Sequence, residues 1–400
     1  MNCLIFGAGK IARGFIGHLL YLSGARFVFV EKSDELADLI NKRGCYTVNV
    51  LGAPEKNTLV TGVGALKYDD SYNIACAVSG ADAVFTAVGG KNLAELPPIL
   101  AKGIMKKSQI GGSLNIIACE NWKQPGAFLR NDIRRLLDAG YHKYFDYHVG
   151  VTEAVVMRSA IEADELSLRQ DPLTVNVQDF WDLPVDASRV AGLQSDNYRG
   201  RHILLGIRSL RLVDGFAGFL ERKFYTYNAA NGTVSYAGAL LGYHKIADAA
   251  HDERILKILS GVYDETSRAL SVKYKIPLED QTAFAKTSLD KLQDYTIVDY
   301  IERNARDPIR KLGPDDRLTG AARMVMEYGV KPDNLALAIA CAVYYKNPKD
   351  PSAVELAQIR SAGGIDGVLE KVCKIGPSGE LFALVRQKAG LLKDWGWIHE

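Results

Sequence analysis

A glycine-rich turn near the start of the chain constrains its fold more than any other feature. The apolar run Cys3–Phe6 is followed at once by Gly7-Ala8-Gly9-Lys10-Ile11-Ala12, and a helical pattern, Ile11–Ser23, begins inside this turn. A strand that leads through Gly-x-Gly-x-x-(Gly/Ala) into a helix is the context in which this short motif is typical of a dinucleotide-binding loop. A plain glycine turn between a strand and a helix is the alternative interpretation.

Each small residue of this turn has a distinct part in such a loop. Gly7 permits the tight turn, Gly9 lets the backbone approach a pyrophosphate, and Ala12 allows close packing of the helix on the strand. The start of the helix adds free N–H groups and a partial positive charge. The residues predicted to hold the cofactor here are Phe6, Gly7, Ala8, Gly9, Lys10, Ile11 and Ala12.

An acidic residue after the next strand predicts which dinucleotide is used. Glu31 directly follows the β-branched and aromatic run Phe27–Val30, about 20 residues beyond the glycines. A carboxylate there accepts hydrogen bonds from the adenosine ribose and repels a 2′-phosphate. NAD is therefore expected as the cofactor, although Lys32 and Ser33 leave dual use of NAD and NADP open.

The first half of the chain alternates apolar strands with helical patterns, which is typical of a parallel sheet covered by helices on both faces. Further segments of this pattern are a helix at Asp34–Arg43, a strand at Ala83–Val88, a helix at Asn92–Met105, and strands at Leu114–Cys119 and Leu173–Phe180. The small residues Ala87, Val88 and Gly89 leave a strand at the edge where such sheets bind ligands, and they are expected to make room for the nicotinamide half of the cofactor. A tight strand exit would explain them nearly as well.

With 400 residues, the chain exceeds the size at which a single core usually stops growing, so two domains are expected. After about Phe216 the pattern is helical almost throughout. The prediction is an α/β, Rossmann-type, NAD-binding domain with a mostly parallel sheet over residues 1–195, followed by a mainly α-helical substrate and catalytic domain over 196–400. Helices are expected at Ala247–Tyr274, Gly320–Gly329, Leu335–Tyr345 and Val354–Ala362.

The composition argues against several other classes of protein. The chain has 49 Lys and Arg against 47 Asp and Glu, and this balance is far from the strong positive charge of a protein that neutralises many nucleic-acid phosphates. No apolar stretch reaches the roughly 20 residues that span a bilayer, and Lys10 and Arg13 interrupt what could be a signal peptide. Six scattered cysteines fit a reducing cytoplasm best. We therefore expect a small-molecule ligand, with no nucleic-acid or membrane partner.

A second group of polar residues opens the helical half of the chain. On a helix, Lys223, Asn228 and Asn231 fall within an arc of about 140°, so they can face one cleft. Phe224, Tyr225 and Tyr227 lie between them, and their low-dielectric rings favour a neutral amine. A surface lysine beside an aromatic stripe is the alternative.

These motifs together resemble the polyol-specific long-chain dehydrogenases, most of all the mannitol-1-phosphate 5-dehydrogenases among them. The resemblance covers nearly the whole chain in the same order. It rests on Phe6 to Gly17, Thr86 to Gly89, Leu114 to Asn121, Glu221-Arg222-Lys223 with Asn228, Arg310-Lys311-Leu312, Asp316-Arg317-Leu318 and Glu327-Tyr328-Gly329. That family is zinc-independent, and the seven histidines of this chain show no H-E-x-x-H or equivalent spacing.

The resemblance implies a catalytic Lys-x-x-x-x-Asn-x-x-His signature, of which Lys223 and Asn228 match the first two positions. Asn231 stands where the family has histidine. A base that takes the hydroxyl proton at neutral pH needs a lysine pKa lowered by roughly 2 to 3 units, and Lys223 is the candidate. Asn228 is expected to donate its amide N–H to the developing alkoxide, with Asn231 as a second donor.

The resemblance also extends the predicted site to the cofactor and the substrate. Asn121 is expected near the cofactor, while Arg158, Arg310 and Lys311 are expected to hold the substrate, a polyol phosphate, by charge-assisted contacts. Met157 and Lys10 depart from the family's usual Asp and Asn. Alternatives are a sugar acid or a free polyol as substrate, and a catalytically silent NAD-binding regulator. The expected assembly is a monomer or a homodimer.

Overall fold

The computed structural model describes residues 1–193 and 202–399, which form two compact units, Met1–Phe216 and Ala217–Glu400. The domain boundary expected at residues 195 and 196 lies outside the described residues.

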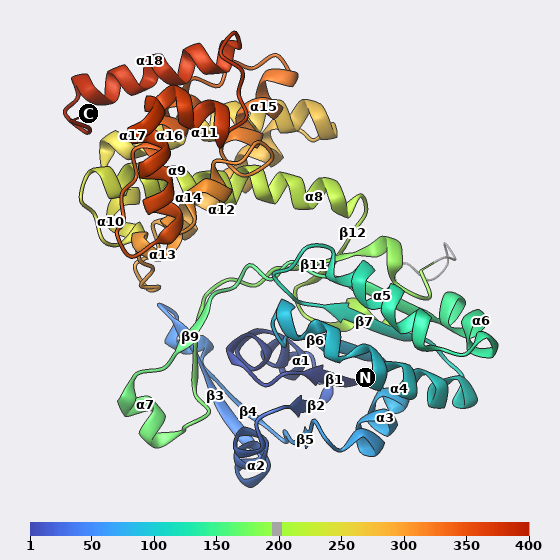
Figure 1. Ribbon diagram of the computed structural model, residues 1–400. Helices are drawn as coiled ribbons and strands as arrows, with labels where there is room; N and C mark the ends of the chain where they lie inside the picture. Colours follow the sequence, from blue (N-terminus) through green and yellow to red (C-terminus); the bar gives the residue numbers. More distant parts are fainter. Residues whose placement is uncertain (194–201, 400) are drawn as a thin grey trace. The chain divides into compact units, whose positions relative to one another are not determined.

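A six-stranded sheet with all neighbours parallel forms the centre of the first unit (Figure 1). Its strands follow the order β5-β2-β1-β6-β7-β8. The chain adds strands on one side of β1 and then, from β6 onward, on the other, so β1 and β6 flank the point where the direction of winding reverses. Ligands of parallel α/β sheets bind at such a switch point, beyond the carboxyl ends of the strands. The strands are β1 (Asn2–Phe6), β2 (Arg26–Glu31), β5 (Ala65–Lys67), β6 (Ala83–Thr86), β7 (Leu114–Ala118) and β8 (Val149–Glu153).

Alternation along β1 explains why both faces of this sheet are covered. Leu4 and Phe6 point into a core shared with α3 to α6, whereas Cys3 and Ile5 point into a second core on the opposite face. Successive side chains of a strand face opposite sides, so the apolar run from Cys3 to Phe6 needs a core on each face of the sheet. The helices of this unit are α1 (His18–Leu22), α2 (Asp34–Arg43), α3 (Ser71–Gly80), α4 (Pro97–Ile110), α5 (Pro125–Leu136), α6 (Ala139–His148) and α7 (Glu165–Gln170).

The helix α2 shows how local sequence sets these elements. Ser33 caps its N-terminus by accepting a hydrogen bond from Leu36 N at 3.2 Å, and Gly44 ends it in the left-handed conformation with φ 62°. Serine at the N-cap and glycine after the last turn are the preferred residues for these positions. The predicted helix Asp34–Arg43 is confirmed to the residue.

A smaller sheet, which the sequence did not reveal in full, packs on the helical segment Ala12–Leu22 that lies against β1 and β2 of the large sheet. Its order is β4-β3-β10-β9, and only β10 falls within a predicted strand. Gly14 lies directly on it, since a Cβ there would come within 2.6 Å of Val177 Cγ1. The predicted helix Ile11–Ser23 accordingly becomes a π-helix, η1 (Ala12–Gly17), followed by α1. The added strands are β3 (Cys45–Leu51), β4 (Thr58–Thr61), β9 (Ala160–Glu162), β10 (Val175–Gln178) and a pair, β11 (Leu183–Asp186) with β12 (Leu210–Val213). Short 3₁₀-helices are η2 (Pro54–Lys56), η3 (Gly90–Glu95), η4 (Ala187–Arg189) and η6 (Ile203–Gly206).

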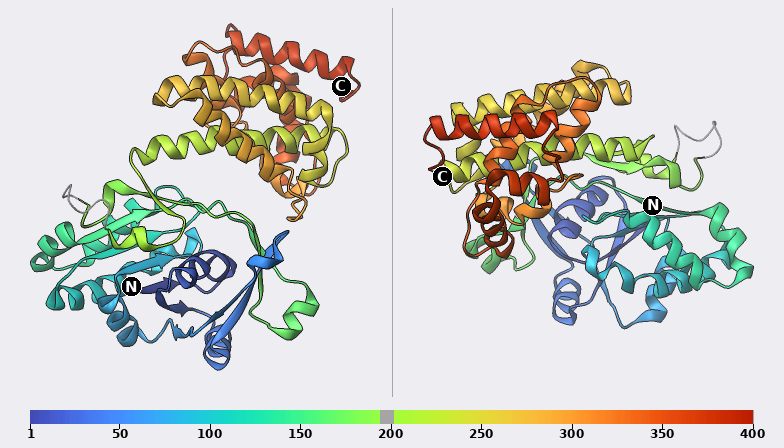
Figure 2. Two further views of the ribbon diagram at one scale, coloured as in Figure 1. Left: turned by 180° about the vertical axis from the view of Figure 1, so that it is seen from behind. Right: turned by 45° about the horizontal axis from the view of Figure 1, so that its top comes forward.

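The second unit is helical, as predicted (Figure 2). Its core surrounds α16, whose residues Leu335 to Val343 are all buried. The expected helix Ala247–Tyr274 is interrupted, because Asp252 caps a new helix by accepting hydrogen bonds from Arg254 N and Ile255 N. The helices are α8 (Phe216–Lys223), η7 (Phe224–Asn228), α9 (Ala229–Leu240), α10 (Ile246–His251), α11 (Glu253–Tyr274), α12 (Leu278–Leu292), α13 (Ile301–Ala305), α14 (Pro308–Lys311), α15 (Thr319–Glu327), α16 (Asp333–Val343), α17 (Pro351–Lys371) and α18 (Glu380–Asp394).

The described residues contain neither a membrane-spanning helix nor a cluster of metal-binding side chains. Within 1–193 and 202–399, no helix is long and apolar enough to cross a membrane. Over the same ranges, no three His, Cys, Asp or Glu side chains gather as they would around a metal ion.

Candidate active site

The glycine-rich turn lies at the switch point of the large sheet. Gly7 has a φ of +89° and donates its N–H to Val30 O at 2.7 Å. A Cβ at Gly7 would come within 2.5 Å of Ala87 O, whereas a Cβ at Gly9 would meet nothing within 4 Å. Gly7 therefore serves the fold of the turn, while Gly9 leaves open space beside the backbone, as an approaching pyrophosphate requires.

Glu31 is held beside this turn by backbone donors. Its Oε2 accepts a hydrogen bond from Ala8 N at 2.7 Å, and its Oε1 accepts from Lys32 N at 2.8 Å and Ser33 N at 2.9 Å. The Lys32 amine forms an ion pair with Glu95 at 2.9 Å. This arrangement places a carboxylate at the end of β2, where the adenosine ribose of NAD is bound in such folds.

The exit of β6 is shaped by a residue that sequence reasoning missed. Glu120, which is 9% exposed, accepts hydrogen bonds from Val88 N at 2.8 Å and Gly89 N at 2.9 Å. The predicted residues Ala87 to Gly89 thus follow β6 directly beside the glycine-rich turn, while Asn121 is exposed after β7. In the sequence, Glu120 could have been recognised as an acidic residue that directly follows the apolar strand Leu114–Cys119. Of the remaining loop residues, Ala12 is buried and Lys10 pairs with Glu162 at 2.9 Å.

In the second unit, a π-helical turn joins the predicted catalytic residues. Lys223 ends α8, Asn228 ends η7, and Asn231 lies in the first turn of α9. In η7 the N–H of Ala229 bonds to Phe224 O, five residues earlier. Because a π-helix places residues five apart above one another, it brings Lys223 and Asn228 onto one side more closely than the expected α-helix would.

The surroundings of Lys223 disfavour its charged form. Burial lowers the pKa of Lys223, and the nearby Arg317 guanidinium lowers it further. No ion pair to Lys223 is found within residues 1–193 and 202–399. Burial, followed by the charge of Lys223, also lowers the pKa of Lys291 on α12 to about 8. The structure thus supplies the low-dielectric, cationic setting that a lysine base needs.

Asn231 and Lys311 meet at one residue of α13. Asn231 Nδ2 donates to Asn304 Oδ1 at 3.1 Å, and Lys311 Nζ donates to the backbone oxygen of Asn304. Burial, Arg317 and Arg310 together lower the pKa of Lys311 to about 8. Two of the residues expected to contact substrate are therefore neighbours, and Asn304, which the sequence did not single out, lies between them.

The two predicted substrate arginines differ in their surroundings. Arg310 is 55% exposed at its side chain and pairs with Asp307 at 2.5 Å and Asp316 at 3.2 Å. Arg158 is only 2% exposed, inside the first unit, where it donates to Gln178 O at 2.7 Å and Gly14 O at 3.1 Å. An arginine buried in this way holds segments of its own unit together, and it is not part of the substrate site that we propose.

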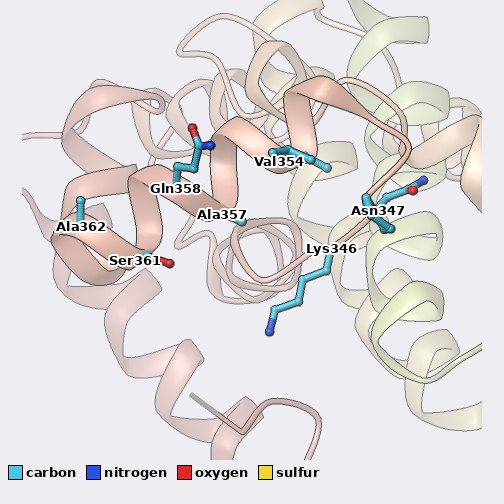
Figure 3. A pocket seen from close by; sticks show the side chains of 9 residues that line it. Lys346, Asn347, Val354, Ala357, Gln358, Ser361 and Ala362 are labelled. Atoms are coloured by element: carbon cyan, nitrogen blue, oxygen red, sulfur yellow. The ribbon is translucent and has the colours of Figure 1, made fainter.

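Two open cavities of the second unit differ in chemistry. One, of about 660 Å³, lies between the segment Lys346–Pro348 and the small residues of α17 (Figure 3), and no predicted site residue lines it. The other, of about 580 Å³, is lined by Arg303, Arg306 and Lys349 together with Glu302 and Asp350. The second cavity includes residues of α13, the helix that carries Asn304.

The parallel sheet, the switch-point turn and Glu31 define a Rossmann-type dehydrogenase that uses NAD. Residues 1–195 match the Mannitol dehydrogenase Rossmann domain, and residues 216–370 match the Mannitol dehydrogenase C-terminal domain. The chain belongs to the mannitol dehydrogenase family and is an NAD-dependent polyol dehydrogenase.

Two solved structures share this fold over 99% of the chain. A D-sorbitol dehydrogenase in substrate-free form is 15% identical, with a TM-score of 0.80 and 93% of its own chain covered. The mannitol 2-dehydrogenase of Pseudomonas fluorescens, in a ternary complex with NAD and D-mannitol, is 16% identical, with a TM-score of 0.68 and 92% of its chain covered. At this identity the two structures show a shared fold alone.

Proposed function

We propose that the protein transfers hydride between NAD and a secondary alcohol of an open-chain polyol phosphate, of the mannitol 1-phosphate and fructose 6-phosphate type. The observation that carries this proposal is the setting of Lys223: a partly buried amine with a lowered pKa, one π-turn from Asn228. A neutral amine beside an amide donor is the pair that alcohol oxidation requires.

In this reaction NAD supplies the hydride acceptor in one direction and the hydride donor in the other. Lys223 Nζ takes the proton of the reacting hydroxyl as the C–H bond breaks. The amide N–H of Asn228 donates to the oxygen while it carries negative charge, and one such preorganised donor contributes roughly 3 kcal/mol. In the direction of reduction, protonated Lys223 returns the proton to the carbonyl oxygen.

Charges near the site favour a phosphorylated substrate. Within the described residues, Arg306 and Lys349 have no ion pair and line the cavity of about 580 Å³. Two cations beside a cavity can bind a phosphate dianion by charge-assisted hydrogen bonds. Arg310 forms ion pairs with two aspartates, so we assign it a structural role in the segment between Asp307 and Asp316. We assign the contact with substrate hydroxyls to Lys311.

A substrate panel tests this proposal. NADH oxidation is measured with fructose 6-phosphate, fructose, fructuronate and tagaturonate, and the expected order of kcat/KM places fructose 6-phosphate first. Arg306→Gln should lower kcat/KM for fructose 6-phosphate by about 10-fold, the loss of one charge-assisted contact, and leave fructose unchanged. Arg135→Gln, at an exposed pair on α5, is the matched control. A preference for fructose or for a uronate would exclude the phosphate assignment, and no turnover with any of them would favour a silent NAD-binding protein.

A further inference from the structure

Asn304 makes hydrogen bonds with three parts of the second unit. Its Nδ2 donates to Tyr300 O at 3.0 Å, and its Oδ1 accepts from Asn231 Nδ2 at 3.1 Å. Its backbone oxygen accepts from Lys311 Nζ. The residue lies on α13, which packs against α9, the helix of Asn231 (Figure 1).

The polarity of these bonds is determined by Tyr300. A carbonyl oxygen only accepts hydrogen bonds, so the amide of Asn304 must turn its Nδ2 towards Tyr300 O and its Oδ1 towards Asn231. Asn231 in turn must present its Nδ2 to Asn304. Its Oδ1 and one remaining N–H are then directed elsewhere, which makes Asn231 an acceptor for a hydroxyl as well as a donor.

We propose that Asn304 is a positioning residue for the substrate: it orients the Asn231 amide so that Asn231 Oδ1 accepts a hydrogen bond from a substrate hydroxyl, and it holds the Lys311 amine beside it. This inference rests on the proposed function and names a residue that acts through others. If the side-chain amide of Asn231 could rotate freely, it would present either its Nδ2 or its Oδ1 to the substrate hydroxyl. With Asn304 in place, Asn231 Oδ1 is held as an acceptor, and a substrate hydroxyl that donates to it satisfies the site.

The side chain of Asn304 is not needed to hold its helix. Ile301 and Ala305 bury the inner face of α13, and Tyr236 OH donates to Ala305 O at 3.1 Å. Asn304 itself is only partly buried. Replacement of its amide should therefore leave α13 folded, so a change in kinetics can be separated from a loss of structure.

A double-mutant cycle with Asn304→Leu, Asn231→Leu and the double variant tests the proposal. We expect Asn304→Leu to raise KM for the sugar substrate by about 3- to 10-fold, as expected for losing one net hydrogen bond, and to change kcat by less. The double variant should be no worse than Asn231→Leu, because both changes remove the same interaction. Gln387→Leu, at an exposed amide on α18 far along the chain from these residues, is the control and should match wild type.

Two kinetic outcomes would overturn the proposal: an unchanged KM in Asn304→Leu, or independent, multiplying effects of the two changes in the double variant. Absence of turnover in wild type with every sugar would instead remove the proposed function. Side-chain amide NMR of protein labelled with ¹⁵N-asparagine then reads the hydrogen bonds directly. Slow exchange of an Asn231 Nδ2 proton that becomes fast in Asn304→Leu supports the orienting contact, and fast exchange in wild type contradicts it.

Discussion

The two units carry their functional groups in opposite ways. In the first unit, the predicted cofactor loop consists of backbone: Gly7 makes the turn, Gly9 leaves space, and even Glu31 is held by three backbone N–H groups. In the second unit, the proposed site consists of side chains, Lys223, Asn231 and Lys311, that are partly or fully buried and have shifted pKa values or amide contacts.

This difference shows what each kind of ligand requires. A pyrophosphate is recognised by free N–H groups and by close approach, and a short contiguous turn provides both. Proton transfer requires a titratable group in a low-dielectric setting, which only packing from several helices provides. Mutations in the first unit should therefore act by filling space or by changing the backbone conformation. Mutations in the second unit should act by changing the charge of a side chain.

The largest expected effect is on the rate. Lys223→Met should lower kcat/KM by about 10³-fold, in the range for the loss of a general base, without lowering the melting temperature, because a partly buried amine with a lowered pKa is replaced by an apolar chain. Steady-state NADH oxidation and thermal unfolding measure the two effects. Lys286→Met, at an exposed pair on α12, should leave both unchanged. A Lys223→Met enzyme that retains its rate would show that catalysis does not depend on the Lys223 amine.

A pair of glycine substitutions sharpens the contrast within the first unit. Gly7→Ala should destabilise the fold by about 1 to 3 kcal/mol from its positive φ alone, and more from the approach to Ala87 O. Gly9→Ala should leave stability unchanged, because its Cβ meets no atom, but should weaken NADH binding by about 10-fold or more if a pyrophosphate occupies that space. Chemical denaturation and NADH fluorescence titration separate the two. Equal effects on folding and binding in both variants would contradict the division of roles.

The smallest expected effect is a dependence of stability on pH. The folded-state pKa of Lys291, about 8, is lower than its ordinary value of 10.5. Below about pH 8 the amine is charged in the folded state, and its burial lowers the free energy of unfolding by the full amount. Between pH 8 and pH 10.5 this destabilisation disappears, because the folded state loses the proton at a lower pH than the unfolded state does. The melting temperature of Lys291→Met minus that of wild type should thus be most positive at pH 7 and fall towards pH 10. A difference in melting temperature that is constant over this pH range would show that folding does not lower the pKa of Lys291.

Much of the first unit could be predicted from the sequence because its signals are local. The glycine-rich turn, the capped helix α2 and the apolar strands each depend on residues that are neighbours in the chain. The smaller sheet was largely missed, because β3 pairs with β10 more than a hundred residues later, and no local pattern encodes that partner. The interruption of the first helix by η1 has a similar origin, since its close contact at Gly14 comes from β10.

The sequence alone was enough to predict the two-part organisation and the Rossmann-type NAD-binding domain, because both rest on short spacings and on periodic burial. Lys223 and Asn228 stay a predicted catalytic pair, which the family resemblance implies. Only the tertiary structure decided that Arg158 lies in the interior, that Arg310 is paired with aspartates, and that Asn304 connects Asn231 to Lys311. The physical reason is that charge pairing and amide orientation depend on which distant side chains come within about 3 Å, and that distance is set by helix packing.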